Sequence, residues 1–298
     1  MSSAVNKLIE EKLLKNPPKW MKDNICLEVI TGSFAYGVSS DTSDMDVVGF
    51  VIPPKDIIFP HLAGGIIGFG EQPEEFGQFS QHHIFSKENN KEYDVTIYNI
   101  VKFFNLCMQN NPNMVDVLFS PVNCVLHMNE IGQLLRDNRK MFLHKGVYNK
   151  FRGYAFQSLT KLENGANKTN PKRRESIKKY GMDVKHAYHI IRLLLQVEQI
   201  LVEGDLDLRR NIEVLKSIRN GEWSIERIKK FFETKESYLV VLYQNSKLPY
   251  EADEEKIKAL LIQCLEIHYG NLDKAVSVEN NYDAMGREIR ETMERYGI

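Results

Sequence analysis

Residues 32–37 read Gly-Ser-Phe-Ala-Tyr-Gly, and residues 43–46 read Ser-Asp-Met-Asp after a short polar link. A Gly-Ser turn can wrap a phosphate with backbone N–H groups and a hydroxyl. Asp44 and Asp46 are two positions apart, so on a strand their carboxylates would point to one face and could share a divalent cation. A phosphate-binding turn beside a cation site is typical of nucleotide transfer.

The residues around this stretch predict strands on both sides of the turn. Residues 25–31 form an apolar, β-branched run that stops at Gly32, and residues 45–52 form a second run that ends at Pro53. An isolated Asp-x-Asp is more often a solvated turn. The Gly-Ser sequence upstream and the two strands favour a metal site here.

A two-metal site needs a third acidic ligand, and Asp94 is the best candidate. It lies in the middle of residues 91–98, a segment with strong β propensity. Glu92 has the same parity on that strand and is the fallback, while an ordinary surface carboxylate is the alternative for Asp94. Asp116 is interpreted as a helix-surface or pairing residue.

Together these residues resemble the DNA polymerase β-like nucleotidyltransferase superfamily. Gly-Ser-x-Ala-Tyr-Gly followed by Ser-Asp-x-Asp resembles its RNA-repair-associated, RlaP-like branch of bacterial and phage proteins, and the resemblance covers about residues 24–205. It implies an α+β fold, in which a polymerase-β-like nucleotidyltransferase core with a mixed β-sheet flanked by helices is followed by a C-terminal helical domain.

The resemblance also implies roles for residues of the motif. Gly32 and Ser33 would hold the triphosphate of the nucleotide, and Tyr36 and Ser43 are assigned to the same nucleotide site. Asp44, Asp46 and Asp94 would be the catalytic residues and would bind two Mg²⁺ ions, for which Mn²⁺ could substitute.

The helix around residue 185 is the best place to seek further substrate contacts. Lys185, His189 and Arg192 recur at i, i+4 and i+7, so they share one helix face beside an apolar face that supplies the core. Such a basic stripe is either a solvated face or a phosphate-facing one, and the resemblance favours nucleotide or acceptor binding. A denser cluster of basic residues is either solvated surface or a binding site for RNA phosphates. It consists of Lys172, Arg173, Arg174, Lys178 and Lys179.

Histidines contribute less to the predicted site. His82 and His83 are expected to be a pair on a strand near the site, and no more. A zinc site through His186 and His189 is disfavoured because further ligands are not evident.

Charge is distributed unevenly along the chain. Residues 1–140 contain 12 Lys and Arg and 17 Asp and Glu, whereas residues 141–220 contain 16 and 8. We expect a catalytic domain over residues 1–140 and an α-helical substrate-binding domain over residues 141–298. The basic segment suits a polyanion such as an NTP or a nucleic acid, and the mixed charge elsewhere favours binding to an RNA end.

Composition places the chain among ordinary globular proteins, with 298 residues, 43% hydrophobic and 27% charged. No apolar run approaches the ~20 residues that span a bilayer, so no membrane association is expected. Four distant cysteines argue against a zinc ribbon or a disulfide framework. We expect thiols, most of them buried, in the reducing cytoplasm of a bacterial or phage-infected cell.

Periodicity predicts the remaining elements. Residues 1–22 suggest a helix that closes at Asn16-Pro17-Pro18. Further helices are expected at 98–110, 128–140, 147–163, 174–203, 209–219, 223–245 and 252–271, with a short strand at 122–127. A Gly-rich loop at 61–77, a flexible linker at 165–171 and a loosely docked terminal helix at 277–298 complete the prediction.

The function predicted from these observations is transfer of an NMP from an NTP, ATP or another, to an acceptor hydroxyl with release of pyrophosphate. The acceptor favoured by the basic segment and the resemblance is an RNA end, as in repair of tRNA or another RNA. One alternative is nucleotidylation of a protein or small molecule, such as AMPylation. An alternative of another class is a non-catalytic nucleotide- or RNA-binding module.

Overall fold

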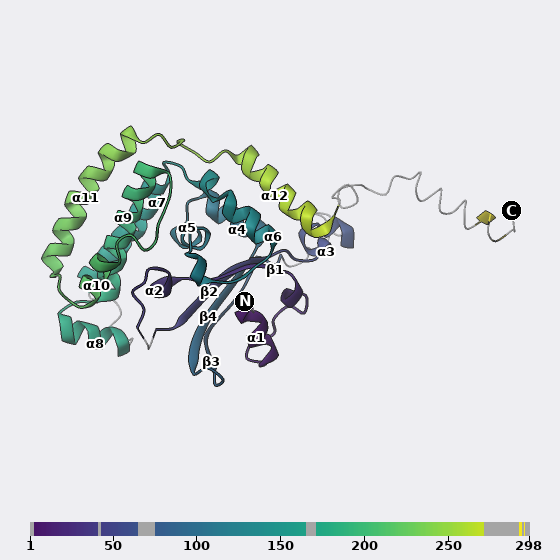
Figure 1. The fold of residues 1–298 in the computed structure, drawn as a ribbon, viewed down its shortest axis with the longest axis horizontal. Coiled ribbons are helices and arrows are strands. Elements are labelled where there is room, and N and C mark those ends of the chain that lie inside the picture. Colours follow the sequence, from purple (N-terminus) through teal and green to yellow (C-terminus); the bar gives the residue numbers. More distant parts are fainter. Residues whose placement is uncertain are drawn as a thin grey trace.

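A mixed β-sheet carries the predicted motif at its centre (Figure 1). The computed structural model describes residues 3–40, 43–64, 75–164, 171–270, 292, 293 and 295. Within these residues the sheet has five strands in the order β3-β4-β2-β1-β5. Their bounds are Ile25–Ile30 (β1), Met45–Val51 (β2), Gln78–Ser86 (β3), Lys91–Asn99 (β4) and Val125–Met128 (β5).

Strand direction and burial follow from the sequence pattern. β2 and β4 are parallel, whereas β1 pairs antiparallel with both β2 and β5, and β3 pairs antiparallel with β4. β1 is buried along its whole length, as its uninterrupted apolar run predicts. β3 is an edge strand with many exposed positions, and it extends well beyond the histidine pair that was predicted there.

Four helices of the first half cover the sheet, with α4 and α6 above it and α1 below it in Figure 1. They are α1 (Ala4–Glu10), α4 (Ile100–Met108), α5 (Pro112–Leu118) and α6 (Glu130–Asp137), and each has a Ser or Asn N-cap whose side chain accepts from a backbone N–H. The helix predicted to close at Asn16-Pro17-Pro18 is shorter in the structure, since α1 ends at Glu10. Lys12 and Asn16 have positive φ, which ends the helical geometry after α1.

Helix α1 is attached to the sheet through a buried carboxyl group. Glu28 on β1 is fully buried, and it accepts hydrogen bonds from the Ser3 hydroxyl at 2.5 Å and the Ala4 amide at 2.8 Å. Burial raises the pKa of Glu28, while its bonds to Ser3 and Ala4 lower it. The start of the chain is therefore fixed under the sheet.

The second half of the chain is helical. Its elements are α7 (Val147–Glu163), α8 (Pro171–Tyr180), α9 (Val184–Glu203), α10 (Ile212–Arg219), α11 (Ile225–Asn245) and α12 (Glu254–Tyr269). Helix α9 is largely buried and packs against α7, α10 and α11, whereas α12 returns to pack on α4 and α6. The remaining short elements are η1 (Met21–Asp23), α2 (Gly32–Ala35), α3 (Lys55–Ile58), η2 (Pro60–Ala63), η3 (Val122–Cys124) and η4 (Arg139–Phe142).

One long helix predicted at 174–203 is two helices in the structure. Gly181 has a φ of +75°, and Asp183 caps α9 by accepting from the amides of Lys185 and His186. A left-handed glycine followed by an Asp N-cap ends one helix and starts the next. Ile177, Tyr180, Val184 and Ala187 keep helical spacing across this break and hide it.

Three further predictions fall mostly on residues that the structure does not describe. Most of the Gly-rich loop (61–77), nearly all of the linker (165–171) and most of the terminal segment (277–298) lie outside the described residues.

All four cysteines are free and buried, as predicted. In the part of the chain that the structure describes, no helix is both long and apolar enough to cross a bilayer.

Gly49 is required by close packing at the centre of the sheet. A Cβ atom there would lie 1.9 Å from the Leu27 carbonyl oxygen on β1, so the two strands would have to separate. We expect Gly49→Ala to lower the free energy of unfolding by about 1–3 kcal/mol in chemical denaturation. The matched control is Gly153→Ala in α7, where no atom lies within 4 Å of the added methyl group, and the change should raise stability by up to about 1 kcal/mol. A neutral Gly49→Ala would contradict this reading of the β1–β2 contact.

Candidate active site

The Gly-Ser turn is tied to the carboxylate strand by its backbone. Thr31 follows β1, and its amide and hydroxyl both bond to the Asp46 carbonyl oxygen, at 2.8 and 3.2 Å. Gly32 has a φ of +63°, and a Cβ atom there would lie 2.3 Å from Oδ2 of Asp46. Only glycine therefore lets the turn lie directly against the carboxylate of β2. Ser33, the next residue, lines a cavity that Asp46 also lines.

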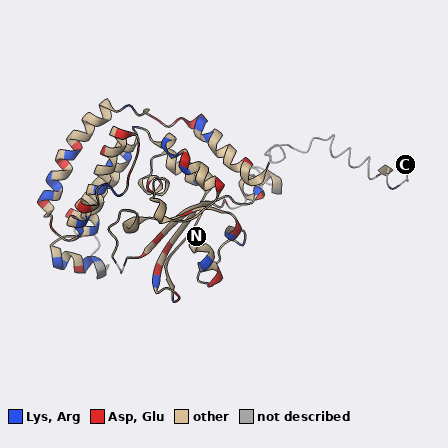
Figure 2. Ribbon diagram, in the orientation of Figure 1, with Lys and Arg blue, Asp and Glu red and all other residues tan. Residues whose placement is uncertain are grey.

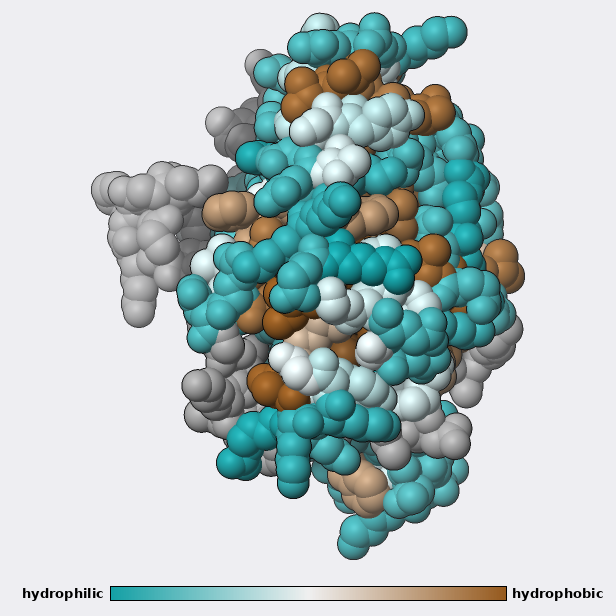
Figure 3. All heavy atoms as spheres, turned by 90° about the vertical axis from the view of Figure 1, so that its left-hand side faces the viewer, coloured by the Kyte–Doolittle hydropathy of each residue, from teal (hydrophilic) through white to brown (hydrophobic). Residues whose placement is uncertain are grey.

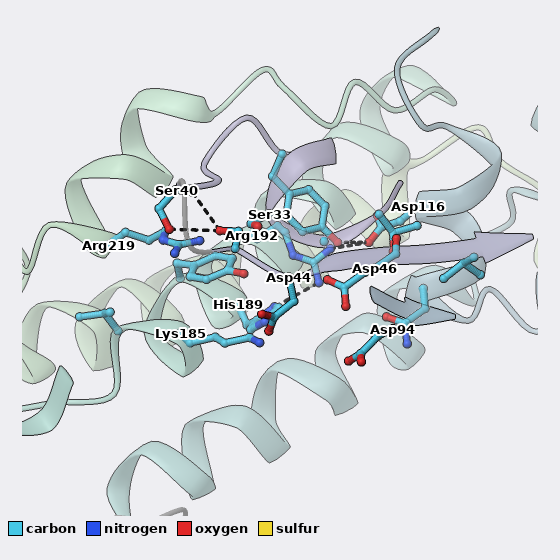
Figure 4. Close-up of a pocket in the computed structure, with 18 of the residues that line it drawn as sticks. Ser33, Ser40, Asp44, Asp46, Asp94, Asp116, Lys185, His189, Arg192 and Arg219 are labelled. Atoms are coloured by element: carbon cyan, nitrogen blue, oxygen red, sulfur yellow. Dashed lines mark hydrogen bonds and ion pairs between the residues drawn. The ribbon is translucent and has the colours of Figure 1, made fainter. Parts of the chain in front are cut away.

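The three predicted carboxylates surround one cavity of about 550 Å³ (Figure 4). Asp46 and Asp94 are register partners on the parallel strands β2 and β4, so their side chains lie next to each other on one face of the sheet. Asp44 immediately precedes β2 and contributes to the cavity from the loop. The structure thus brings together the acidic residues that are separated by about fifty positions in the sequence.

Electrostatics of this group fit a cation. Burial raises the pKa of Asp46, nearby Lys185 lowers it, and the negative charges of Asp94 and Asp44 raise it further. Oxygen atoms of carboxylates, such as those of Asp44, Asp46 and Asp94, are the donors that Mg²⁺ and Mn²⁺ prefer. Among the described residues, no three His, Cys, Asp or Glu side chains are arranged to hold an ion as they stand.

Tyr36, at the end of the Gly-Ser helix α2, is anchored in a buried network. Its hydroxyl donates to Oδ2 of Asp116 on α5 at 2.5 Å, and the Arg192 guanidinium lies 4.3 Å from its ring centroid. Asp116 also accepts from Arg192 at 2.7 Å and from Gln196 at 2.9 Å, both on α9. Burial raises the pKa of Asp116, and the charge of Arg192 lowers it. Of the two interpretations of Asp116, pairing is right and a helix-surface position is wrong, since Asp116 is 1% exposed.

The three residues predicted to form a basic stripe on α9 lie in different environments. Lys185 is exposed and faces the carboxylates, whereas His189 is half-buried and Arg192 is buried. Burial and the neighbouring charges of Arg192 and Lys185 hold the pKa of His189 well below its usual range, so its imidazole is neutral at pH 7. Arg192 and Tyr36 line the cavity, but both form hydrogen bonds to Asp116. Their direct contact with a nucleotide therefore stays a prediction.

Cations gather at the end of the cavity away from Asp94. Arg219, the last residue of α10, lies there beside Ser40 in Figure 4, with its guanidinium 5.3 Å from the Tyr188 ring centroid. Arg173 of α8 also lines the cavity and bonds to the buried Asp183 at 2.5 Å. Ser43, predicted to bind nucleotide, accepts from the Ser40 amide at 2.9 Å and thus shapes the loop before Asp44.

The predicted RNA cluster lies mostly on α8, whose blue ribbon marks its basic character in Figure 2. Arg174, Lys178 and Lys179 are exposed, whereas Arg173 points into the cavity. Lys172 is in α8, but its side chain lies outside what is described. The face that includes α8 and α11 is mostly hydrophilic, with separate hydrophobic patches (Figure 3).

Several cavity residues were missed by the sequence analysis. Arg219 reaches the cavity from α10, and Thr96 and Tyr98 reach it from β4. His82 of β3 also lines the cavity, near the site as expected. No local motif marks Arg219, since its place depends on how α10 packs against α9. The parity of residues 94, 96 and 98 could have indicated Thr96 and Tyr98, because alternate residues of a strand share one face.

A family model described as RlaP, RNA repair pathway DNA polymerase beta family, matches residues 5–238. Comparison with curated proteins gives no match. Among solved structures, a nucleotidyltransferase-like protein from Exiguobacterium sibiricum 255-15 is similar over 98% of this chain and 79% of its own, with 11% sequence identity and a TM-score of 0.30. A score this low transfers no property from that protein.

The buried pair of Asp116 and Arg192 generates a stability prediction. Asp116→Asn removes the carboxylate charge bonded to a guanidinium that is only 5% exposed. Breaking a buried ion pair in this way should lower the free energy of unfolding by about 3–5 kcal/mol, measured by chemical denaturation. The control is Asp205→Asn at the largely exposed pair with Lys140, where we expect a loss below about 1 kcal/mol. Equal effects of the two changes would argue against a structural role for the buried pair.

Proposed function

Because the chain belongs to the RNA repair pathway DNA polymerase β family, we propose that it is a metal-dependent nucleotidyltransferase that moves an NMP from an NTP to an acceptor hydroxyl on an RNA end. The observation that carries this proposal is the in-register placement of Asp46 and Asp94 on parallel strands, with Gly32 against Asp46. That arrangement would put a metal-binding donor set beside a polyphosphate-binding turn. Residues 1–140 would supply catalysis, and residues 141–298 would supply substrate binding.

The donor nucleotide would lie between the turn and helix α9. The Ser33 hydroxyl and backbone N–H groups of the turn would bond to phosphate oxygens, since Gly32 and Ser33 line the cavity. Lys185 would add a positive charge, and its effect on the pKa of Asp46 supports its nearness to the reacting groups. Arg219 and Arg173 extend the positive potential toward the far end of the cavity.

Asp44, Asp46 and Asp94 would hold the divalent cations, Mg²⁺ or Mn²⁺. When bound, such cations supply Lewis-acid stabilisation of negative charge on the phosphates and lower the pKa of a hydroxyl. The carboxylates orient these ions, and Asp94 stands on the β4 side of the cavity next to Thr96 and Tyr98.

The proposed reaction is an in-line displacement at the α-phosphorus. The acceptor oxygen forms a bond to that phosphorus while the bond to the β-phosphate oxygen breaks, pyrophosphate leaves, and the hydroxyl proton passes to solvent. The residues of this chain would act by holding both reactants in place and by neutralising charge, which are the main contributions expected in phosphoryl transfer.

An RNA acceptor is favoured by the surface next to the cavity. Exposed Arg174, Lys178 and Lys179 on α8 adjoin the pocket residues Arg173 and Ser176 of the same helix. A polyanion that enters the cavity at α8 would therefore meet positive charge both outside and inside it. The family description, which refers to an RNA repair pathway, agrees with this choice.

Asp44→Asn tests the catalytic assignment. It removes a charge from the metal-binding donor set, so kcat with NTP labelled in the α-phosphate, Mg²⁺ and RNA should fall by at least about three orders of magnitude, equivalent to about 4 kcal/mol. The unfolding midpoint should stay close to that of wild type, since the change also relieves repulsion on Asp46. Asp56→Asn on α3, exposed and outside the cavity, is the matched control. Retained Mg²⁺-dependent transfer by Asp44→Asn would refute the assignment.

The double change Arg174→Ala and Lys178→Ala tests the acceptor. Loss of two phosphate contacts should weaken RNA binding and reduce the slope of log Kd against log salt by about 0.7 for each contact. KM for the NTP should not change. The control removes two exposed lysines of α12 instead, Lys256 and Lys258, and should leave RNA binding as it is. Label that is transferred only to polypeptide from a cell extract would eliminate the RNA acceptor.

A further inference from the structure

An extra residue in strand β3 lies opposite the carboxylate of β4. Gln81 pairs with Val95 and Ile84 pairs with Tyr93, so both His82 and His83 stand opposite Asp94. Two residues against one is a β-bulge, a feature that redirects groups near active sites. His83 has a φ of +56°, a left-handed conformation that is uncommon for a residue other than glycine.

The bulge turns two nitrogen atoms toward the Asp94 side chain. The His83 amide donates to Oδ1 of Asp94 at 2.8 Å, and Nδ1 of His82 lies 3.4 Å from Oδ2. Both carboxylate oxygens are thus engaged, one by backbone and one by an imidazole that itself lines the cavity. In a regular antiparallel ladder, one residue of β3 would face Asp94 and its amide would be available only for backbone pairing.

Glu92 completes the arrangement from the outer side. Its Oε1 lies 2.6 Å from Nδ1 of His83, and Glu92 does not line the cavity. The fallback prediction of Glu92 as the third acidic ligand therefore has no support from its position. Glu92 instead holds the exposed side chain of His83, which keeps the strained residue in place.

We propose that the His82–His83 bulge is a clamp that positions Asp94 for metal binding, with His82 as a positioning residue. This inference rests on the proposed function, because it takes Asp94 as a metal ligand. Each carboxylate oxygen has two lone pairs, so an oxygen that accepts one hydrogen bond can still coordinate a cation. Groups that orient a ligand from behind in this way commonly change metal affinity 10–100-fold when they are removed.

His82→Ala is the direct test. We expect the Kd for Mn²⁺, measured by titration calorimetry on the metal-free full-length chain, to rise at least about tenfold because Asp94 loses one of its two restraints. His82→Gln, whose side-chain amide can donate a hydrogen bond, should recover part of this loss. His83→Gly keeps the amide and tolerates positive φ, so it should bind Mn²⁺ within about twofold of wild type.

The control on the same edge strand is Gln78→Ala, which should leave the Kd for Mn²⁺ unchanged. Thermal unfolding of each variant identifies any loss of fold, and His82→Gln and His83→Gly keep the test open if His82→Ala unfolds. The clamp is overturned if His82→Ala binds Mn²⁺ like wild type while Asp94→Asn binds it weakly. If Asp94→Asn itself binds Mn²⁺ like wild type, the proposed metal role of Asp94 fails, and the proposed function fails with it.

Discussion

The buried ion pair between Asp116 and Arg192 is the interaction on which the rest of the site depends. It joins α5, next to the sheet, to α9 in the helical half, and Tyr36 connects it to the Gly-Ser turn. A buried charge is stable only when it is paired and hydrogen-bonded, so these elements keep their positions together. The ion pair thereby fixes the distance between the Gly-Ser turn and α9, which belong to distant parts of the chain. A fixed distance is necessary for one nucleotide to contact the turn, the carboxylates and α9 at the same time.

The cavity separates its charges by position. Carboxylates lie at the start of β2 and within β4, whereas Lys185, Arg173 and Arg219 approach from helices of the second half. The sheet positions the acidic groups rigidly because strand register fixes them, and the helices bring in the cations through packing. This division suits a substrate whose phosphates must meet metal ions on one side and protein cations on the other.

The motif strands and the acidic residues Asp44, Asp46 and Asp94 could be predicted from the sequence, because periodicity, turn residues and motif spacing are local properties. The α+β fold was implied by the family resemblance. The sequence did not reveal the break at Gly181, since the apolar period continues through it, or the bulge at His82 and His83, since one extra residue in an edge strand leaves no compositional mark. The burial of Arg192 was also missed, because helix spacing gives the face of a residue but not what packs on that face. Arg219 joins the cavity only through tertiary packing.

The parallel pairing of β2 and β4 has a consequence for how this protein can vary. Asp46 and Asp94 are held side by side by backbone hydrogen bonds between two adjacent strands, independently of the chain that connects them. Residues 52–77 can therefore gain or lose length among relatives without displacing either carboxylate, since closing a longer loop costs little free energy. Evolution could use that connection to elaborate recognition of different partners while the chemistry stays the same.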